Sequence, residues 1–187
     1  MRNGATCKTE KLLAHAAAWR LASLLLERPR PQWQSEIVQL STEVSEPQLS
    51  ACVGEADQAT EELYHWVFGP GGTVSPREVS YCGFEDPGRV MAELQFYYRA
   101  FSFQPRREES IDHISVEAGF TGYLFLKEAY AQLGGNAETI DITSSARLRF
   151  AKEHLTRCAQ GMIDRPTDMP PYIRNALSWL AEKGGAL

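Results

Sequence analysis

The sequence lacks the features that mark several large classes of protein. Its four cysteines, Cys7, Cys52, Cys82 and Cys158, form no C-x-x-C pair. This spacing argues against a zinc ribbon or a redox dithiol, because either needs two thiolates within a few residues of each other. The richest apolar run, Leu21 to Leu26, is far shorter than the roughly 20 residues of a membrane helix. We therefore expect free, buried thiols and no membrane span.

Basic charge is also scarce. The 187 residues include 24 acidic and 19 basic side chains, which give a net charge of −5, whereas nucleic-acid-binding proteins depend on basic surfaces that neutralise phosphates. The first residues do not show the charged, apolar and small segments of a secretory leader, and one core suffices for chains of up to roughly 250 residues. The sequence predicts a single cytoplasmic domain over residues 1–187 that binds no nucleic acid.

Alternating runs of β-branched residues are missing, and apolar side chains recur instead at three- and four-residue steps, as they do from Leu12 to Leu26. This period indicates helices with one buried face. The predicted fold class is all-α, with six to eight helices in one globular domain. We expect helices over residues 8–27, 33–44, 47–68, 86–101, 111–133 and 143–161, and a last helix that opens at Pro170-Pro171. The expected N-caps are Ser45, Asp86 and Thr143-Ser144-Ser145.

One long connection interrupts the helical pattern. Phe68-Gly69-Pro70-Gly71-Gly72 ends a helix, because glycine and proline disfavour helical geometry, and no clear period returns before Asp86. Connections of this length inside a compact domain tend to be functional or mobile. We therefore expect a long loop over about residues 69–86 that takes part in function.

Charge is unevenly distributed along the chain. No Lys or Arg occurs between Arg30 and Arg77, whereas the segment from Arg147 to Arg157 is mainly basic. The acidic residues of the first stretch are Glu36, Glu43, Glu46, Glu55, Asp57, Glu61 and Glu62. Two interpretations remain open. The two segments can be solvated helix faces, with or without facing each other. Alternatively, the acidic one can receive a basic peptide, since carboxylates bind arginine in a bidentate manner and attract cationic partners.

The densest polar cluster is Glu109-Ser-Ile-Asp112-His113-Ile-Ser-Val-Glu117. On a helix, Glu109, His113 and Glu117 would share one face, and Asp112 would lie near the N-terminus, where a carboxylate complements the helix dipole. Three interpretations remain open: a first-turn charge cluster with His113 hydrogen-bonded to a neighbour, a recognition site for a partner, or a metal site.

A metal-dependent enzyme finds little support elsewhere in the sequence. Di-iron carboxylate bundles use two Glu-x-x-His motifs, and the chain has one, Glu62-Leu-Tyr-His65. The Gly-x-Ser-x-Gly of a nucleophile elbow is absent, and Gly69-Pro70-Gly71-Gly72 is not followed by the Gly-Lys-Ser/Thr of a phosphate loop. The sequence therefore predicts neither a catalytic set nor a bound cofactor.

Three motifs, taken in order, resemble those of the TorD/DmsD/NarJ-like chaperones of molybdoenzymes. Phe68-Gly69-Pro70-Gly71, followed by Pro76 and by Glu78-Val-Ser80-Tyr81, is similar to the loop of that family. His154-Leu155 is similar to the His-Leu of the family's late helix. The third motif lies between these two.

This third motif is Asp112-His113-Ile114 with Glu117 and Phe120, which is similar to the family's Asp-His-Ile/Leu-x-x-Glu-Leu-x-Phe signature. The sequence departs from the signature at Ala118-Gly119. The resemblance covers about Leu12 to Trp179 and is weaker in the first half.

The resemblance implies a TorD-like, cytoplasmic chaperone without catalytic activity. Such proteins bind the catalytic subunit of a molybdopterin-containing oxidoreductase of the DMSO reductase family, in many cases through its twin-arginine signal peptide. They assist cofactor insertion and assembly before export. The resemblance also implies a monomer or a domain-swapped dimer that exchanges helices at the long loop.

The resemblance further implies where the client binds. Asp112 and His113 match the motif tied to signal-peptide recognition, so we expect Asp112 to be the charge partner of a peptide arginine and His113 to be its hydrogen-bonding neighbour. The expected client-binding residues are Asp112, His113, Glu117, Trp66, Phe68, Gly69, Pro70, Pro76 and Tyr81.

Three alternatives remain open. The acidic surface can serve solubility alone, so that an apolar groove lined by Trp66, Phe68 and Tyr81 takes the hydrophobic part of the signal. The chain can also be a helical adaptor for an unrelated complex, or a metal-dependent helical-bundle enzyme.

Overall fold

A computed structural model describes residues 2–106 and 108–187, with side chains from Thr6 onward; Met1 and Arg107 lie outside the described residues. The described chain is helical and has no strands, apart from one isolated bridge between Arg77 and His113. It forms eight helices when α7, a π-helical turn and α8 are counted as one continuous rod, which confirms the predicted all-α fold. Within the described residues, each helix is too short or too polar to cross a lipid bilayer.

The elements follow one another along the chain in a simple order. They are α1 (Arg2–Leu25), α2 (Trp33–Ser41), α3 (Pro47–Glu55), the 3-10 turn η1 (Ala56–Gln58), α4 (Glu61–Phe68), the 3-10 turn η2 (Glu78–Ser80), α5 (Pro87–Ala100), α6 (Ile114–Leu133), α7 (Ala137–Phe150), the π turn η3 (Ala151–Leu155), α8 (Thr156–Ile163) and α9 (Pro171–Ala186).

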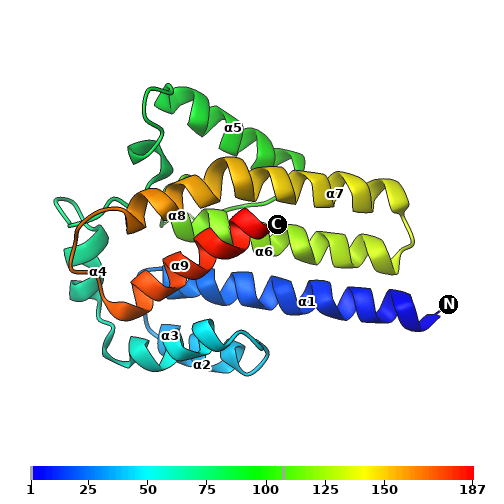
Figure 1. Ribbon diagram of the computed structural model, residues 1–187, viewed down its shortest axis with the longest axis horizontal. Helices are drawn as coiled ribbons and strands as arrows, with labels where there is room; N and C mark the ends of the chain where they lie inside the picture. Colours follow the sequence, from blue (N-terminus) through cyan, green and yellow to red (C-terminus); the bar gives the residue numbers. More distant parts are fainter. Residues whose placement is uncertain (1, 107) are drawn as a thin grey trace.

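Helices α1 and α6 lie side by side along the long axis of the molecule (Figure 1). Helix α7 packs against α6, α9 packs against α8 and α3, and α5 lies at the edge farthest from α2 and α3. Two glycines of α6 allow the close approach of α1, because a Cβ atom at Gly119 or Gly122 would come within 3.1 Å of Ser23 Oγ or Trp19 Cβ. The departure from the family signature at Ala118-Gly119 therefore has a packing role.

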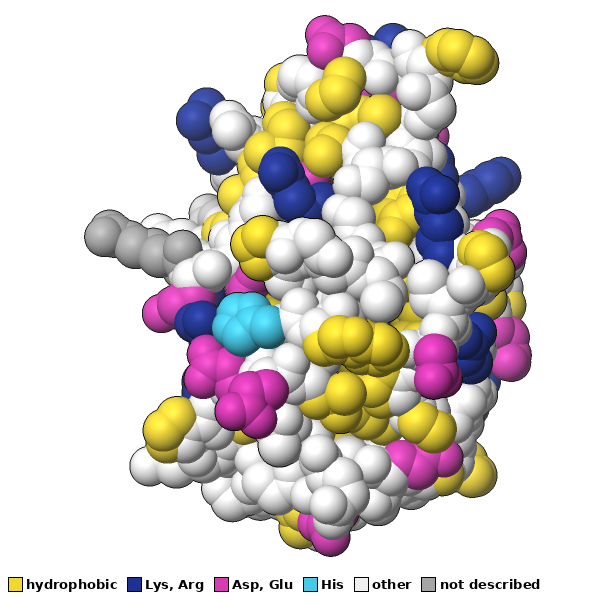
Figure 2. All heavy atoms as spheres, turned by 90° about the vertical axis from the view of Figure 1, so that its left-hand side faces the viewer, with side chains coloured by type: hydrophobic (Ala, Val, Ile, Leu, Met, Phe, Trp, Pro, Cys, Tyr) yellow, Lys and Arg dark blue, Asp and Glu magenta, His cyan; other side chains and the backbone are white. Residues whose placement is uncertain are grey.

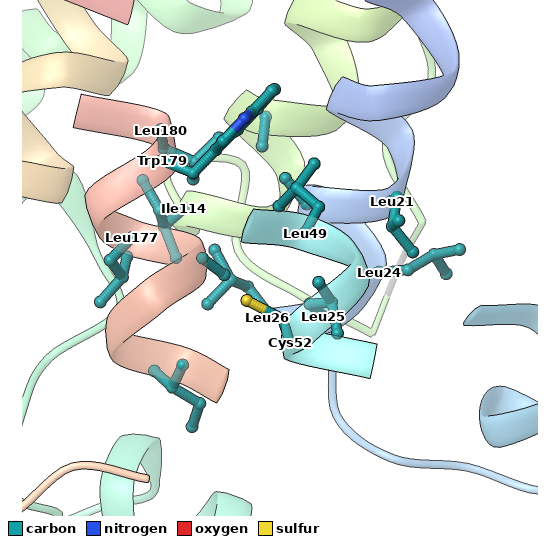
Figure 3. Close-up of a cluster of buried hydrophobic side chains, with 14 of the residues drawn as sticks. Leu21, Leu24, Leu25, Leu26, Leu49, Cys52, Ile114, Leu177, Trp179 and Leu180 are labelled. Atoms are coloured by element: carbon teal, nitrogen blue, oxygen red, sulfur yellow. The ribbon is translucent and has the colours of Figure 1, made fainter. Parts of the chain in front are cut away.

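The largest core lies between α1, α3, α6 and α9, and Figure 3 shows Leu21, Leu49 and Leu177 among the side chains that meet there. Trp19 packs edge to face on Trp179, with ring centroids 5.1 Å apart. Each fully buried leucine, isoleucine or valine of this core stabilises the fold by roughly 1.5–3 kcal/mol. This core fixes the helices around which the remaining segments fold.

A second, aromatic core holds α5 against α6 and α7. Phe120 of α6 packs against Tyr98 of α5 and Phe150 of α7, with centroid distances of 4.8 and 4.7 Å. Such pairs add roughly 0.5–1.5 kcal/mol beyond their area burial. Tyr97 extends this cluster to His154 at 5.8 Å, so the aromatic core reaches the π turn.

Local signals predicted some helix ends correctly and others wrongly. Asp86 caps α5 by accepting a hydrogen bond from Gly88 N at 3.0 Å, and the last helix opens at Pro170-Pro171 as expected. The predicted cap at Thr143–Ser145 is wrong, because these residues lie inside α7, whose N-cap is Asn136. The predicted cap at Ser45 is also wrong, since Glu46 holds that position.

Several predicted helices have different bounds, and two of these differences affect the region of the loop. The expected helix over residues 47–68 is divided into α3 and α4, because Thr60 caps a new helix by accepting from Leu63 N at 3.1 Å. The expected helix over 111–133 begins only at Ile114, with His113 as its N-cap. Consequently Glu109, His113 and Glu117 do not share a helix face, because Glu109 precedes the helix and His113 is its cap.

The cysteines are all free. Cys52, Cys82 and Cys158 are buried, as predicted. Cys7 is exposed on α1, so the prediction of a buried thiol is wrong there.

Candidate functional site

The long loop leaves α4 through a tight turn that folds back on the helix it follows. A Cβ atom at Gly69 would lie 2.4 Å from the carbonyl oxygen of His65, and one at Gly72 would lie 2.5 Å from that of Val67. The amide of Val74 then donates to Val67 O at 3.0 Å. Glycine is therefore required at both positions by the close approach of two backbone segments.

The second half of the loop pairs with the residues that precede α6. Glu78 N donates to Asp112 O, and Ile114 N donates to Pro76 O, both at 2.8 Å. Arg77 and His113 form the isolated antiparallel bridge between these hydrogen bonds. The loop and the start of α6 thus form one connected structure at the end of the molecule where α4 lies (Figure 1).

Asp112 is fully buried, and its carboxylate is bonded within the chain. Arg77 Nε donates to its two oxygens at 3.0 and 3.2 Å, Ser110 Oγ donates at 2.5 Å, and Val79 N donates at 3.5 Å. Arg77 itself is 46% exposed. A client arginine can reach Asp112 only by replacing the guanidinium of Arg77.

His113 closes the N-terminus of α6 with its side chain. Its Nδ1 accepts from Ser115 N at 3.2 Å, so Nε2 carries the proton of the neutral ring and lies 3.0 Å from Tyr64 OH. Burial lowers the pKa of His113 to about 4, Asp112 opposes this shift, and the charge of Arg77 adds to it. His113 is therefore a neutral, hydrogen-bonded residue at neutral pH.

Glu117 lies one turn into α6 and is fully buried, although its position in the sequence suggested a surface residue. Burial raises its pKa well above the usual range, and the charges of Glu78 and Asp112 raise it further. No donor within the described residues reaches its oxygens. The surroundings of Glu117 therefore favour its protonated form, and its side chain does not reach the surface.

Glu78, which we did not predict as a site residue, is the second fully buried acid of this region. His154 Nδ1 lies 3.1 Å from both of its oxygens, and Arg157 bonds to it as well as to Glu85. The loop motif and the late His-Leu motif therefore meet in space. The only sequence signal for this contact was that both residues belong to motifs of the resemblance.

A hollow of about 430 Å³ lies between the loop and the start of α6. Among the predicted residues it is lined by Phe68, Gly69, Pro70, Pro76 and His113. The remaining predicted residues do not line it.

Two of these remaining residues are aromatic. Trp66 is 49% exposed on α4, and Tyr81 packs on Gly161 of α8 while its hydroxyl donates to Ser75 O at 2.6 Å. Of the three aromatic residues, Phe68 lines the small hollow, whereas Trp66 and Tyr81 do not. The small hollow is therefore not an apolar groove lined by all three.

A larger cleft of about 820 Å³ lies between α1, α6 and residues 103–106, 108 and 109. Its lining combines apolar side chains with charged ones, including Arg28 and Arg30. Glu27, which also lines it, accepts from Arg20 at 2.7 Å and pairs with Arg106 at 3.4 Å. Glu109 lines both this cleft and the small hollow. The sequence did not predict this cleft, because three segments far apart in the chain form it.

The acidic stretch and the basic segment do not face each other. The basic segment pairs with other acids: Arg147 with Glu128 at 2.9 Å and Arg157 with Glu85 at 2.7 Å. Figure 2 shows the end of the molecule where α4 and the loop lie, with hydrophobic side chains gathered in the lower middle of this face and acidic side chains beside them. The interpretation of two facing helices is therefore wrong.

The Glu62-x-x-His65 motif lies on the surface of α4. His65 Nε2 is 3.5 Å from Glu61. Across residues 2–106 and 108–187, no three His, Cys, Asp or Glu side chains are grouped so that they could hold a metal ion.

The sequence model of the nitrate reductase delta subunit family matches residues 35–162, well over half of the chain. This segment contains the loop, the start of α6 and the π turn, which are the parts that build the small hollow and its buried acids. No curated protein matches the chain. The chain therefore belongs to the nitrate reductase delta subunit family, a TorD-like family of chaperones for molybdoenzyme maturation.

Proposed function

We propose that this protein is a cytoplasmic chaperone that binds the catalytic subunit of a molybdopterin-containing oxidoreductase of the DMSO reductase family. It recognises the twin-arginine signal peptide of that subunit and holds the subunit until cofactor insertion and assembly are complete. The family match over residues 35–162 carries the general role. The small hollow supports the peptide as ligand, because its lining joins the Gly-Pro loop to His113.

The residues of this end of the molecule divide into two groups within the proposal. Phe68, Pro70 and Pro76 line the hollow and contact the peptide directly. Asp112 and Glu117 are fully buried and act through the position of the loop. A charge-assisted hydrogen bond has a defined geometry. The buried carboxylate of Asp112 therefore fixes the position of Arg77 at the edge of the hollow.

Asp112 can also meet the peptide directly if a peptide arginine replaces Arg77, and one variant separates the two roles. If Arg77 competes with the peptide for Asp112, Arg77→Gln will bind an Arg-Arg peptide more tightly than the wild type. If Arg77 holds the loop in its binding position, the same variant will bind more weakly. Isothermal titration calorimetry of the same Arg-Arg peptide with the wild type and with Arg77→Gln measures the two affinities and distinguishes the two roles.

The experiment that tests the proposed function is a pulldown with the tagged protein from its native host, grown anaerobically. We expect the catalytic subunit of a molybdopterin oxidoreductase with its signal peptide still attached. A synthetic copy of that signal peptide should bind the purified chaperone, and replacement of its arginine pair by alanine should weaken binding. Recovery of unrelated partners alone would contradict the proposal and favour a helical adaptor.

Salt separates two modes of peptide recognition. Attraction between arginine and exposed carboxylates weakens as ionic strength rises, because the Debye length falls from about 10 Å at 0.1 M to about 3 Å at 1 M. Burial of the hydrophobic part of the peptide does not weaken in this way. We expect affinity to fall with salt, since acidic side chains border the hydrophobic patch at this end of the molecule (Figure 2).

A further inference from the structure

We propose that Glu109 is the residue that selects an arginine of the client peptide. The inference rests on the proposed function above and names an arginine acceptor within it. The sequence placed Glu109 in the densest polar cluster but outside the Asp-His signature, and it was not among the expected client-binding residues. The inference is based on the position of Glu109 between the two hollows.

Glu109 stands at the junction of the two hollows and lines both. The small hollow extends from it along the Gly-Pro loop, and the larger cleft extends from it between α1 and α6. Its side chain is 21% exposed, so the carboxylate is accessible but partly shielded from water. An arginine bound there has a hollow on either side for the neighbouring residues of the peptide.

Except for Glu117, the other described acids that are not exposed already have cationic partners. Glu27 is paired with Arg20, Glu128 with Arg147, and Asp112 with Arg77. Glu117 is fully enclosed. Among the described acidic side chains that are not exposed, Glu109 is the one that lines a hollow and forms no ion pair with an Arg or Lys.

The neighbours of Glu109 within the chain include a hydrogen-bond donor, Tyr64, but no Arg or Lys forms an ion pair with it within the described residues. His113 Nε2 lies 3.7 Å away and is neutral at neutral pH, and Tyr64 provides a hydroxyl. Burial raises the pKa of Glu109, which means that the charge is incompletely compensated, although the positive charge of Arg28 opposes the shift. A guanidinium would supply two parallel hydrogen bonds to such a carboxylate, whereas an ammonium supplies a point charge. The site should therefore prefer arginine to lysine.

The test uses calorimetry with a synthetic peptide that has an Arg-Arg pair followed by an apolar stretch, together with its Lys-Lys version. We expect Glu109→Gln to weaken binding of the Arg-Arg peptide about 10-fold or more, because a hydrogen bond to a charged group contributes about 1.5–3 kcal/mol. The preference for Arg-Arg over Lys-Lys should disappear in this variant. Glutamine keeps the shape and a hydrogen-bonding oxygen, so the fold should be retained, which circular dichroism will verify.

Glu138→Gln is the control, since Glu138 is exposed and lines neither hollow. It removes the same charge from a position outside the proposed site and should change affinity less than about 2-fold. If Glu109→Gln binds the Arg-Arg peptide as tightly as the wild type and keeps the same preference for arginine, the inference is overturned while the proposed function stands. If the wild type binds neither peptide, both are overturned.

Discussion

Two buried regions of this molecule are built on opposite principles. The core between α1, α3, α6 and α9 is almost entirely apolar. At the end of the molecule where the loop meets α6 and the π turn, the interior instead contains five titratable side chains, each at most 2% exposed. We call this second region the polar seam. Its members are Glu78, Asp112, His113, Glu117 and His154.

The two regions have different roles: the apolar core stabilises the fold, and the polar seam determines the position of the loop. Apolar burial has no direction and stabilises in proportion to area, so the core tolerates small shifts between helices. A buried charge is costly unless its partners are in place, so the seam permits few arrangements of the loop. The seam therefore defines the shape of the small hollow, and single changes there should move the loop without unfolding the domain.

The largest effect on stability is expected in the apolar core. Trp19→Ala removes a side chain that is 1% exposed and packs on Trp179, and loss of such a residue leaves a cavity. The free energy of unfolding should fall by about 3–5 kcal/mol, measured by urea denaturation. Peptide affinity, measured where the variant is still folded, should be unchanged. A loss below about 1 kcal/mol would show that this core does not dominate stability.

The second-largest expected effect is a dependence of folding stability on pH that originates in the polar seam. The pKa of His113 is about 4 in the folded protein, against about 6.5 in an unfolded chain. The unfolded state therefore binds the proton first, and stability is lost as pH falls from about 6.5 to about 4, by up to about 3 kcal/mol.

His113→Gln removes this titration while keeping a polar side chain at the start of α6. Unfolding by urea at a series of pH values should show a smaller loss of stability on the acid side for the variant than for the wild type. The groups that face His113 are Asp112, Arg77, Glu109 and Tyr64, and they remain in both proteins. Identical acid-side losses would exclude His113 as the cause.

A smaller effect should distinguish the seam from ordinary surface charge. Arg77→Ala leaves Asp112 buried without a cation, and we expect a loss of about 1.5–3 kcal/mol together with faster hydrogen exchange in residues 73–82. Arg89→Ala is the matched control, because its partner Glu93 is exposed, and such pairs contribute about 0.3–0.5 kcal/mol. Equal losses in the two variants would mean that the Asp112 pair does not hold the loop.

The sequence predicted best those features that depend on residues close together in the chain, such as helices and some helix ends. Apolar periodicity located most helices, and the cap at Asp86 depends on Gly88, only two residues away. The end of α6 is likewise determined by the residues that follow it directly, Gly134 and Gly135. These signals act within one or two helical turns, so they can be read without the tertiary structure.

The sequence could not predict the seam, because its contacts join distant segments. Asp112 meets Arg77 across 35 residues, and Glu78 meets His154 across 76. A charged residue such as Glu117 indicates an outward face by pattern alone, yet here it lies inside, beside the other acids. The start of α6 was placed too early for the same reason, since Tyr64 and Pro76 help to fix the cap at His113.

The most direct test of the account is hydrogen exchange measured by mass spectrometry, with and without the client's signal peptide. If the hollow beside the polar seam is the binding site, protection will appear in residues 66–81 and 108–117, while the core segments of α1 and α9 exchange as before. Protection confined to other surfaces, with these two segments unchanged at saturating peptide, would contradict the account.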